Sequence, residues 1–162
     1  YNSEDKVDEQ RNKFLELIRD TFDYDEVAIR ALGKNKKVFT EKEFSEFRDV
    51  FAEFLILTYV SKLDFHYENL SIKYLSEEYK GKDNAIIKTM IIKDDLEIPV
   101  DYAMISKKGG WKIYDLAIEG VRFMSNYRKQ YTRFLSKKSP SDLITVIKKK
   151  TENMKLTGNS ES

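Results

Sequence analysis

The period of the hydrophobic pattern changes twice along this chain, and that change limits the folds open to it. In the middle, four segments are rich in β-branched and aromatic residues, and short runs of Gly, Asp, Asn and Lys separate them. The segments cover residues 71–79, 85–93, 97–106 and 111–118. Such spacing predicts an antiparallel meander of four strands. The apolar spacing before and after it is helical, so we expect an α+β protein.

The turns between the predicted strands indicate which side chains share a face. If Lys93 pairs with Leu96 and Ser106 pairs with Trp111, strict alternation gathers an almost wholly apolar set on one side of the sheet. That set is Ala85, Ile87, Thr89, Ile91, Ile98, Val100, Tyr102, Met104, Ile113, Asp115 and Ala117. The opposite face mixes charged residues with apolar ones, Leu116 among them, and is expected to be partly solvated.

Asp115 is the one ionisable residue in the predicted apolar set. A buried carboxylate without hydrogen-bond donors is costly. We therefore expect it to meet donors such as Tyr102, Arg128 or a helix N-terminus. A structural role is the first interpretation, and a polar group at the floor or mouth of a pocket is the second.

Helical spacing predicts two helices ahead of the longest one. The first covers residues 5–20, with Phe14, Leu15, Leu17 and Ile18 as a buried stripe. A short second helix starts at the capping-box-like pair Asp23 and Glu26 and stops at Gly33.

The longest helix is predicted over residues 41–62, because Thr40 and Glu43 form a capping box. Its apolar stripe widens toward its C-terminal half, so it must be nearly surrounded by core or by ligand. Two more helices are predicted, over 121–137 and 140–150. We expect residues 1–155 to form a single domain and residues 156–162 a frayed tail.

Composition excludes several function classes. Lys and Arg number 29 and Asp and Glu 28, so a formal net charge of +1 supplies no general attraction to nucleic acid. There is no cysteine, and the one histidine, His66, has no nucleophile motif around it, so neither catalytic residues nor a metal or cofactor site are expected. No apolar run is long enough to span a bilayer. Because the chain begins at Tyr1, we expect a trimmed or mature form.

The C-terminal region is basic. Lys137 and Lys138 are followed by the run 148–150, also lysines. A solvated helix face that matches the helix dipole is the first interpretation. A local contact with lipid headgroups or with a partner protein is the alternative.

Several separate blocks resemble one known family. They are Ile98-Pro99-Val100-Asp101-Tyr102, Trp111-Lys112-Ile113-Tyr114-Asp115, Glu119-Gly120-Val121, Asn126-Tyr127-Arg128 and Gln130-Tyr131, with weaker blocks at Ala31-Leu32-Gly33, Phe44/Phe47 and Thr58-Tyr59. In this order and spacing they resemble the MlaC, or toluene-tolerance, family of periplasmic phospholipid-shuttle proteins, over about residues 11–150. Arg122 departs from the family pattern, which usually has a serine there.

The resemblance implies a fold and a function. The implied fold is a curved four-stranded antiparallel sheet wrapped by about five helices, a nuclear-transport-factor-like cone with an apolar lipid pocket. The implied function is a non-enzymatic, monomeric carrier in the periplasm. It would shuttle phospholipid between an outer-membrane lipoprotein complex and an inner-membrane ABC transporter with MCE domains, with the tails buried and the headgroup outside.

On this basis we predict which residues contact lipid. They are Phe51, Phe54, Leu55, Thr58, Tyr59, Ile87, Ile98, Val100, Tyr102, Met104, Ile113, Ala117, Val121 and Met124. The pocket is predicted to lie between the strand that contains Val100 and the helix that starts at Val121. At about 0.8 kcal/mol per methylene, exposing some 30 methylenes of two acyl chains to water costs on the order of 24 kcal/mol. A carrier therefore needs a large apolar surface rather than a precise polar site.

Three alternatives stay open at this point. The ligand could be a hopanoid or another hydrophobe. The apolar surfaces could be a filled core, which would make the chain a protein-interaction domain. An isomerase-like active site could lie around Asp115 and Tyr102.

Overall fold

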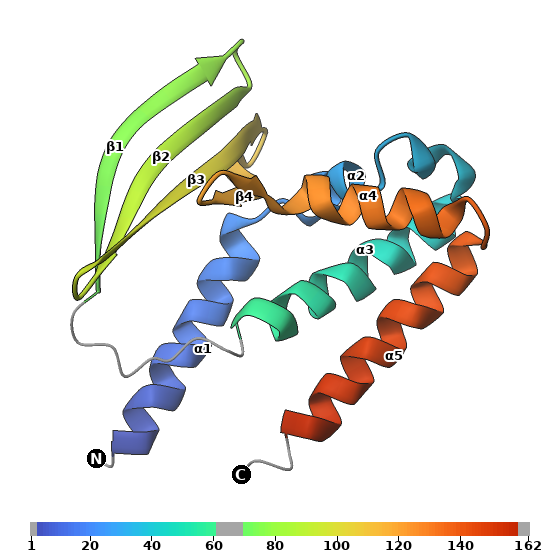
Figure 1. Ribbon diagram of the computed structural model, residues 1–162, viewed down its shortest axis with the longest axis horizontal. Coiled ribbons are helices and arrows are strands. Elements are labelled where there is room, and N and C mark those ends of the chain that lie inside the picture. Colours follow the sequence, from blue (N-terminus) through green and yellow to red (C-terminus); the bar gives the residue numbers. More distant parts are fainter. Residues whose placement is uncertain (1–2, 61–69, 159–162) are drawn as a thin grey trace. The chain divides into compact units, whose positions relative to one another are not determined.

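The computed structural model describes residues 3–60 and 70–158 and contains helices and one antiparallel sheet (Figure 1). The chain divides into two compact units, each built from two separate segments. Residues 1–23 and 64–124 form the sheet unit, and residues 24–63 and 125–162 form the helical unit. The α+β class is thereby confirmed, whereas the single-domain assignment stays a prediction.

The sheet has five antiparallel strands in the order β1-β2-β3-β4-β5. They are β1 (Leu70–Lys80), β2 (Asn84–Lys93), β3 (Leu96–Lys107), β4 (Gly110–Ile118) and β5 (Val121–Arg122). The first four correspond to the predicted strands. Both predicted turn pairs, Lys93 with Leu96 and Ser106 with Trp111, are confirmed.

The fifth strand corrects the prediction of a helix that starts at Val121. Glu119 and Gly120 have φ values of 50° and 82°, as in a two-residue hairpin turn. This turn sends the chain back along β4, so that Val121 pairs with Ile118. The helix α4 (Phe123–Leu135) begins only after this pairing.

A bulge in β4 changes the faces of that strand. Met104 pairs with Ile113 as predicted, but the next pair along the ladder is Ala103 with Asp115. The register therefore skips Tyr114. A bulge of one residue reverses the alternation of one strand relative to its neighbour.

The reversal overturns one predicted grouping. Asp115 and Ala117 do not share a face with Tyr102, because they pair with residues of the opposite face. Leu116 and Ile118 take their places. On the face that contains Tyr102, two large apolar side chains therefore stand where a carboxylate and an alanine were predicted.

The helix α1 (Ser3–Thr21) forms where it was predicted, but its stripe is not buried. Leu17 is 59% exposed, and Phe14, Leu15 and Ile18 are half-buried. The chain after α1 joins the sheet, since the backbone N–H of Asp23 donates to the carbonyl oxygen of Ile113 at 2.9 Å. Sheet pairing, not a buried stripe, links this segment to the strands.

The helical unit contains most of the remaining helices. They are α2 (Tyr24–Leu32), the 3₁₀ segment η1 (Gly33–Val38), α3 (Glu41–Leu55), the π-helical segment η2 (Ile56–Val60), the part of α4 from Ser125 onward, and α5 (Pro140–Gly158). The capping box of Thr40 and Glu43 at α3 is confirmed.

Helix α4 ends at Leu135, two residues before the predicted end at Lys137. Helix α5 extends to Gly158 instead of Lys150, so the first three residues of the expected tail are helical. Its start is capped by Ser139, and hydrogen bonds from the backbone and hydroxyl of Ser139 lower the pKa of Asp142. The predicted end of the longest helix, at Lys62, lies outside the described residues.

Aromatic rings fill the core of the helical unit. Phe47 and Phe51 of α3 are fully buried and stack at 5.3 Å between ring centroids. Tyr127 and Tyr131 of α4 approach the ring of Phe51 edge-on at 5.2 and 5.7 Å. Such edge-to-face contacts favour a fixed angle between α3 and α4.

Ion pairs join α3 to α5 along their length. Lys148 pairs with Glu46 and Lys155 pairs with Glu53, so both partners advance by seven residues. The two helices therefore run parallel, with two turns of each between the pairs. All four side chains are substantially exposed, so each pair contributes at most about 1 kcal/mol.

Gly33 is required by a neighbouring side chain. Its φ is +57°, and a β-carbon there would lie 2.6 Å from Cδ of Arg128. Arg128 is held in that place because its Nη1 donates to the carbonyl oxygen of Arg30 at 3.0 Å. A side chain at position 33 would have to displace this arginine.

We expect Gly33→Ala to lower the free energy of unfolding by about 2 kcal/mol, through the left-handed φ and the clash with Arg128. Gly109→Ala is the matched control, since no atom lies within 4 Å of a β-carbon there and its φ is not in the left-handed region. Urea denaturation of both variants measures the difference. Equal free energies of unfolding for the two variants would show that the Arg128 side chain moves aside at little cost.

Candidate functional site

One face of the sheet is mainly apolar on all five strands. The ladder pairs place on it Ile72, Tyr74, Tyr79, Ala85, Ile87, Thr89, Ile91, Ile98, Val100, Tyr102, Met104, Ile113, Leu116, Ile118 and Val121, with the charged residues Glu77 of β1 and Lys93 of β2 on the same side. We call these residues the apolar face. Its polar groups are few, and the hydroxyl of Thr89 donates to the carbonyl oxygen of Val100 at 2.9 Å. This face offers a wide hydrocarbon surface with few hydrogen-bonding demands.

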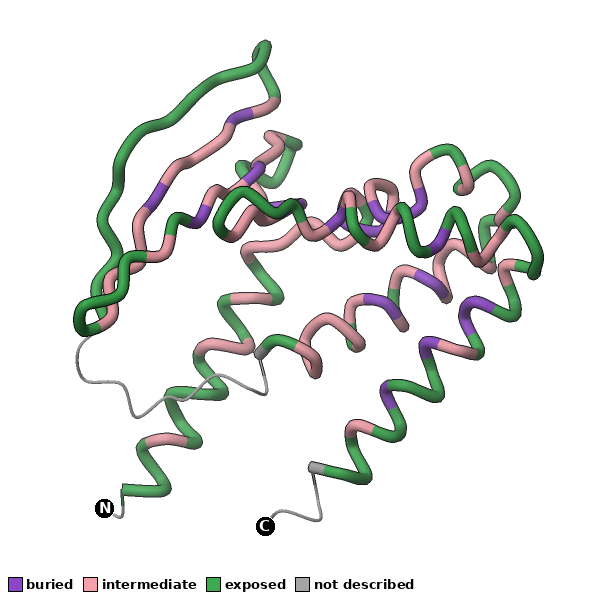
Figure 2. Tube along the Cα trace, in the orientation of Figure 1, coloured by how far each residue is buried: buried purple, intermediate pink, exposed green. Residues whose placement is uncertain are grey.

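The apolar face is poorly covered at β1. All eleven residues of this edge strand are exposed, as the unbroken green of the strand in Figure 2 shows. Ile72 and Tyr74 are 60% and 57% exposed although they belong to the apolar face. Exposed apolar patches of this kind mark binding surfaces for partners or ligands.

Val100, Ile118 and Val121 form a row across β3, β4 and β5. Val100 is 3% exposed, whereas Val121 is 51% exposed. Val121 was predicted to start a helix facing the strand of Val100, but it is a strand residue of the same sheet, separated from Val100 by Ile118. The row leads from a buried part of the face to an open edge.

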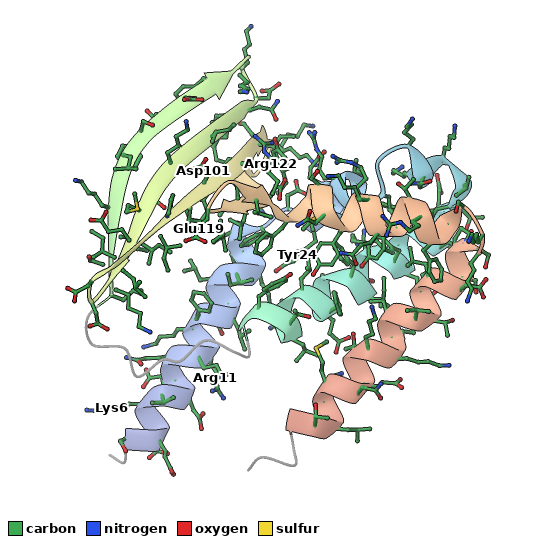
Figure 3. The ribbon with its side chains drawn as sticks, viewed as in Figure 1. Lys6, Arg11, Tyr24, Asp101, Glu119 and Arg122 are labelled. Carbon is green, nitrogen blue, oxygen red and sulfur yellow. The ribbon has the colours of Figure 1, made fainter. Side chains whose placement is uncertain are left out.

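The opposite face mixes polar residues with apolar ones such as Ile86 and Ile105. Asp101, Ala103, Asp115, Ala117 and Arg122 border a small cavity there of about 10 Å³, too small for more than a water molecule. Figure 3 shows Asp101, Glu119 and Arg122 at the β4–β5 end of the sheet. A cavity of this size cannot hold an organic ligand.

Asp115 is buried and acts as a cap. Its Oδ1 accepts hydrogen bonds from the backbone N–H of Leu116 at 2.8 Å and of Met124 at 3.1 Å. Met124 lies in the first turn of α4, so the expected contact with a helix N-terminus is confirmed. Asp115 and Tyr102 lie on opposite faces of the sheet, so they cannot form one active site together.

Five predicted lipid-contacting residues belong to the helical unit: Phe51, Phe54, Leu55, Thr58 and Tyr59. Phe51 is part of the aromatic core, and Phe54 packs beside it at 6.4 Å between ring centroids. The hydroxyl of Thr58 donates to the carbonyl oxygen of Phe54 at 2.7 Å, so this hydroxyl already has a hydrogen-bond partner within its own helical segment.

Tyr59 is 40% exposed, and its hydroxyl lies 2.8 Å from that of Tyr127. Burial, followed by this hydrogen bond, raises the pKa of Tyr127 far above its ordinary value, and burial does the same for Tyr131. Both phenols of α4 therefore stay neutral across the physiological pH range.

The helical unit contains a cavity of about 160 Å³ between α3, α4 and α5. Its walls are Phe54, Tyr127, Tyr131, Phe134, Leu143, Val146 and Ile147, with Gln130 and Lys150 as the polar members. Apolar cavities near 150 Å³ accept ring-sized hydrocarbons. Of these residues only Phe54 was predicted to contact lipid; those of α4 and α5 were not.

Of the nine predicted site residues in the sheet unit, seven lie on the apolar face: Ile87, Ile98, Val100, Tyr102, Met104, Ile113 and Val121. Ala117 lies on the opposite face, and Met124 is buried at the start of α4. The prediction missed Ile72 and Tyr74 of β1, although their alternation was visible. It also missed Leu116 and Ile118, which only the bulge brings to this face. Contact of these residues with lipid stays a prediction.

The described residues contain no group of three or more His, Cys, Asp or Glu side chains arranged to hold a metal ion. His66 lies outside the described residues. None of the described helices combines the length and the hydropathy needed to cross a membrane.

Comparisons with known proteins agree on one family. The family model described as "MlaC protein" matches residues 1–149. The intermembrane phospholipid transport system binding protein MlaC of Haemophilus influenzae is 28% identical over 123 residues, which cover 73% of this chain and 57% of that protein. The chain therefore spans less than two thirds of the length of this relative.

A solved structure shares the fold. The phospholipid-binding protein from Ralstonia solanacearum, determined in complex with a phospholipid, superposes with a TM-score of 0.78 at 20% identity. The match covers 89% of this chain and 83% of that one. An alignment of this extent includes segments of both units.

Proposed function

The chain belongs to the MlaC family, and on that premise we propose that it carries phospholipid between membranes, with the acyl chains packed on the apolar face of the sheet. The observation that carries this proposal is the exposure of large apolar side chains on β1 and β5, which belong to that face. Surface of this kind is costly in water and gains free energy when hydrocarbon covers it.

The name of one relative supports the proposal that lipid moves between membranes. The relative from Haemophilus influenzae is named as the binding protein of an intermembrane phospholipid transport system. We place this chain in the periplasm, between an outer-membrane complex and an inner-membrane MCE-domain transporter. It acts as a carrier without chemistry of its own, and the capping role of Asp115 supports this assignment.

A direct test is mass spectrometry of an organic extract of the purified, folded protein. We expect diacyl phospholipid in roughly stoichiometric amount with little headgroup preference, because tail burial dominates the affinity. A hopanoid or another hydrophobe in its place would correct the ligand class. Repeated lipid-free extracts from folded protein would point to a filled core and a protein-interaction domain.

Two substitutions locate the lipid. Ile72→Asp and Val121→Asp place a carboxylate on the apolar face at positions that are 60% and 51% exposed. We expect each to reduce bound phospholipid by about tenfold or more, because a charge against acyl chains is poorly solvated. The thermal midpoint should stay close to that of delipidated wild type, since neither side chain is buried.

Leu156→Asp is the matched control, because Leu156 is a 69% exposed leucine on α5. It should keep its lipid. Full lipid retention in both sheet variants would contradict the assignment of the acyl chains to this face.

A further inference from the structure

Two stretches of the helical unit contain basic residues and no acidic ones. Residues 33–39, which include η1, have three lysines, and residues 125–139, from α4 to the start of α5, have five basic residues. Neither stretch contains Asp or Glu. In a chain whose formal net charge is only +1, this is a strong local excess.

The fold places these two stretches side by side. Nδ2 of Asn35 donates to Oγ1 of Thr132 at 2.7 Å and also to the carbonyl oxygen of Leu32 at 3.1 Å. The close approach of Gly33 to Arg128 forms a second link. Segments almost a hundred residues apart thus share one surface of the helical unit.

Seven exposed basic side chains belong to this surface, which we call the basic patch: Lys34, Lys36, Lys37, Lys129, Arg133, Lys137 and Lys138. None of the seven forms an ion pair with a carboxylate of the described residues, in contrast to Lys148 and Lys155 of α5. The flanking carboxylates of Glu43 and Asp142 accept hydrogen bonds as helix caps. Asp142 still interacts electrostatically with Lys138, so the patch is partly neutralised at that end and keeps an excess of positive charge elsewhere.

We propose that the basic patch docks the protein on an anionic lipid bilayer surface. Clusters of four to eight Lys and Arg residues bind anionic headgroups, with roughly 1 kcal/mol per residue near the surface. Six of the seven residues are lysines, which are hydrated point charges suited to a diffuse layer of headgroups. Protein interfaces favour Arg and are depleted in Lys, so the composition argues against an acidic protein as the occupant.

This proposal concerns the surface that meets a membrane, and it does not depend on what the apolar face carries. Attraction of this kind acts over about 10 Å at 0.1 M salt and weakens as salt rises. A carrier that must approach and leave a membrane benefits from a contact that is electrostatic and shallow.

Vesicle flotation tests the proposal with two kinds of vesicle, phosphatidylcholine alone and equal parts of phosphatidylcholine and phosphatidylglycerol. Wild type should float with the anionic vesicles at low salt, stay behind with the neutral ones, and lose binding at high salt. Lys37→Glu combined with Lys137→Glu, one change in each stretch, should weaken anionic binding by at least about tenfold.

The matched control is Lys82→Glu combined with Lys108→Glu, at exposed turn positions of the sheet unit. Each double variant changes the formal net charge from +1 to −3, because each reversal removes two charges. The control should bind nearly as wild type does. Equal losses of anionic-vesicle binding in both double variants would show that net charge alone causes the effect. That result would overturn the proposal that the basic patch docks on the membrane.

Absence of wild-type binding to the anionic vesicles would also overturn the proposal and leave an acidic protein as the partner. Thermal midpoints of the variants check that they are folded. Bound phospholipid is measured in the same samples, and it should be unchanged in both double variants. Failure of docking and failure of the carrier function are thus separate outcomes.

Discussion

Phe51→Ala is expected to lower the free energy of unfolding by about 4 kcal/mol. Phe51 is 1% exposed and contacts the rings of Phe47, Phe54, Tyr127 and Tyr131, so its removal leaves a cavity within an aromatic cluster. Against a typical stability of roughly 5–15 kcal/mol, this is a large share. Guanidinium denaturation followed by circular dichroism of the helices measures the loss.

Phe51→Leu is the companion variant, because it keeps an apolar side chain of similar reach. It should cost about half as much. A loss below about 1 kcal/mol for Phe51→Ala would show that the aromatic cluster repacks around the gap, contrary to the tight stacking described above.

Asp115→Ala is expected to cost about 3 kcal/mol, because it leaves the buried N–H groups of Leu116 and Met124 without their shared acceptor. Asp115→Asn keeps an acceptor oxygen and should cost about 1 kcal/mol. Urea denaturation of both variants gives the two values.

Asp101→Ala is the control for Asp115, since Asp101 lies on the same face of the sheet and is only half-buried. Its cost should be about 0.5 kcal/mol or less. A cost for Asp115→Ala no larger than that of the control would mean that α4 does not depend on this cap.

The strands were predictable because their signals are local. Turn residues such as Gly109 and Gly110 lie next to β-rich segments, and each turn fixes the first pair of the ladder that follows. The capping boxes are local in the same way, so the start of α3 was found to the residue. Short-range chemistry decided each of these features.

The errors arose where distant parts of the chain decide the outcome. The bulge at Tyr114 leaves no mark in the sequence of β4, yet it reverses the faces of Asp115 and Ala117. Glu119 takes a positive φ that few residues of its kind adopt, and the hairpin to β5 depends on it. The apolar stripe of α1 predicted a buried helix face, but Leu17 is exposed to solvent.

The candidate site was predictable to the extent that it follows alternation. Residues of β2 and β3, such as Ile87 and Val100, were placed on the apolar face by parity alone. Ile113 of β4 was predicted in the same way, but Leu116 and Ile118 reach this face only through the bulge, which spacing does not reveal. Pairing of α3 with α5 in the cavity wall involves residues about a hundred positions apart, which periodicity does not connect.

The two-segment construction of the helical unit has a consequence for the order of folding. Phe51 emerges from the ribosome 80 residues before its contact Tyr131, and the strands of the sheet unit are made in between. At roughly 5–20 residues per second, α3 waits about 4–16 s for α4. During that interval its aromatic face lacks the native cover that α4 and α5 provide. We expect the nascent chain to be most prone to aggregation at this stage, and most dependent on a chaperone that holds exposed aromatic helices.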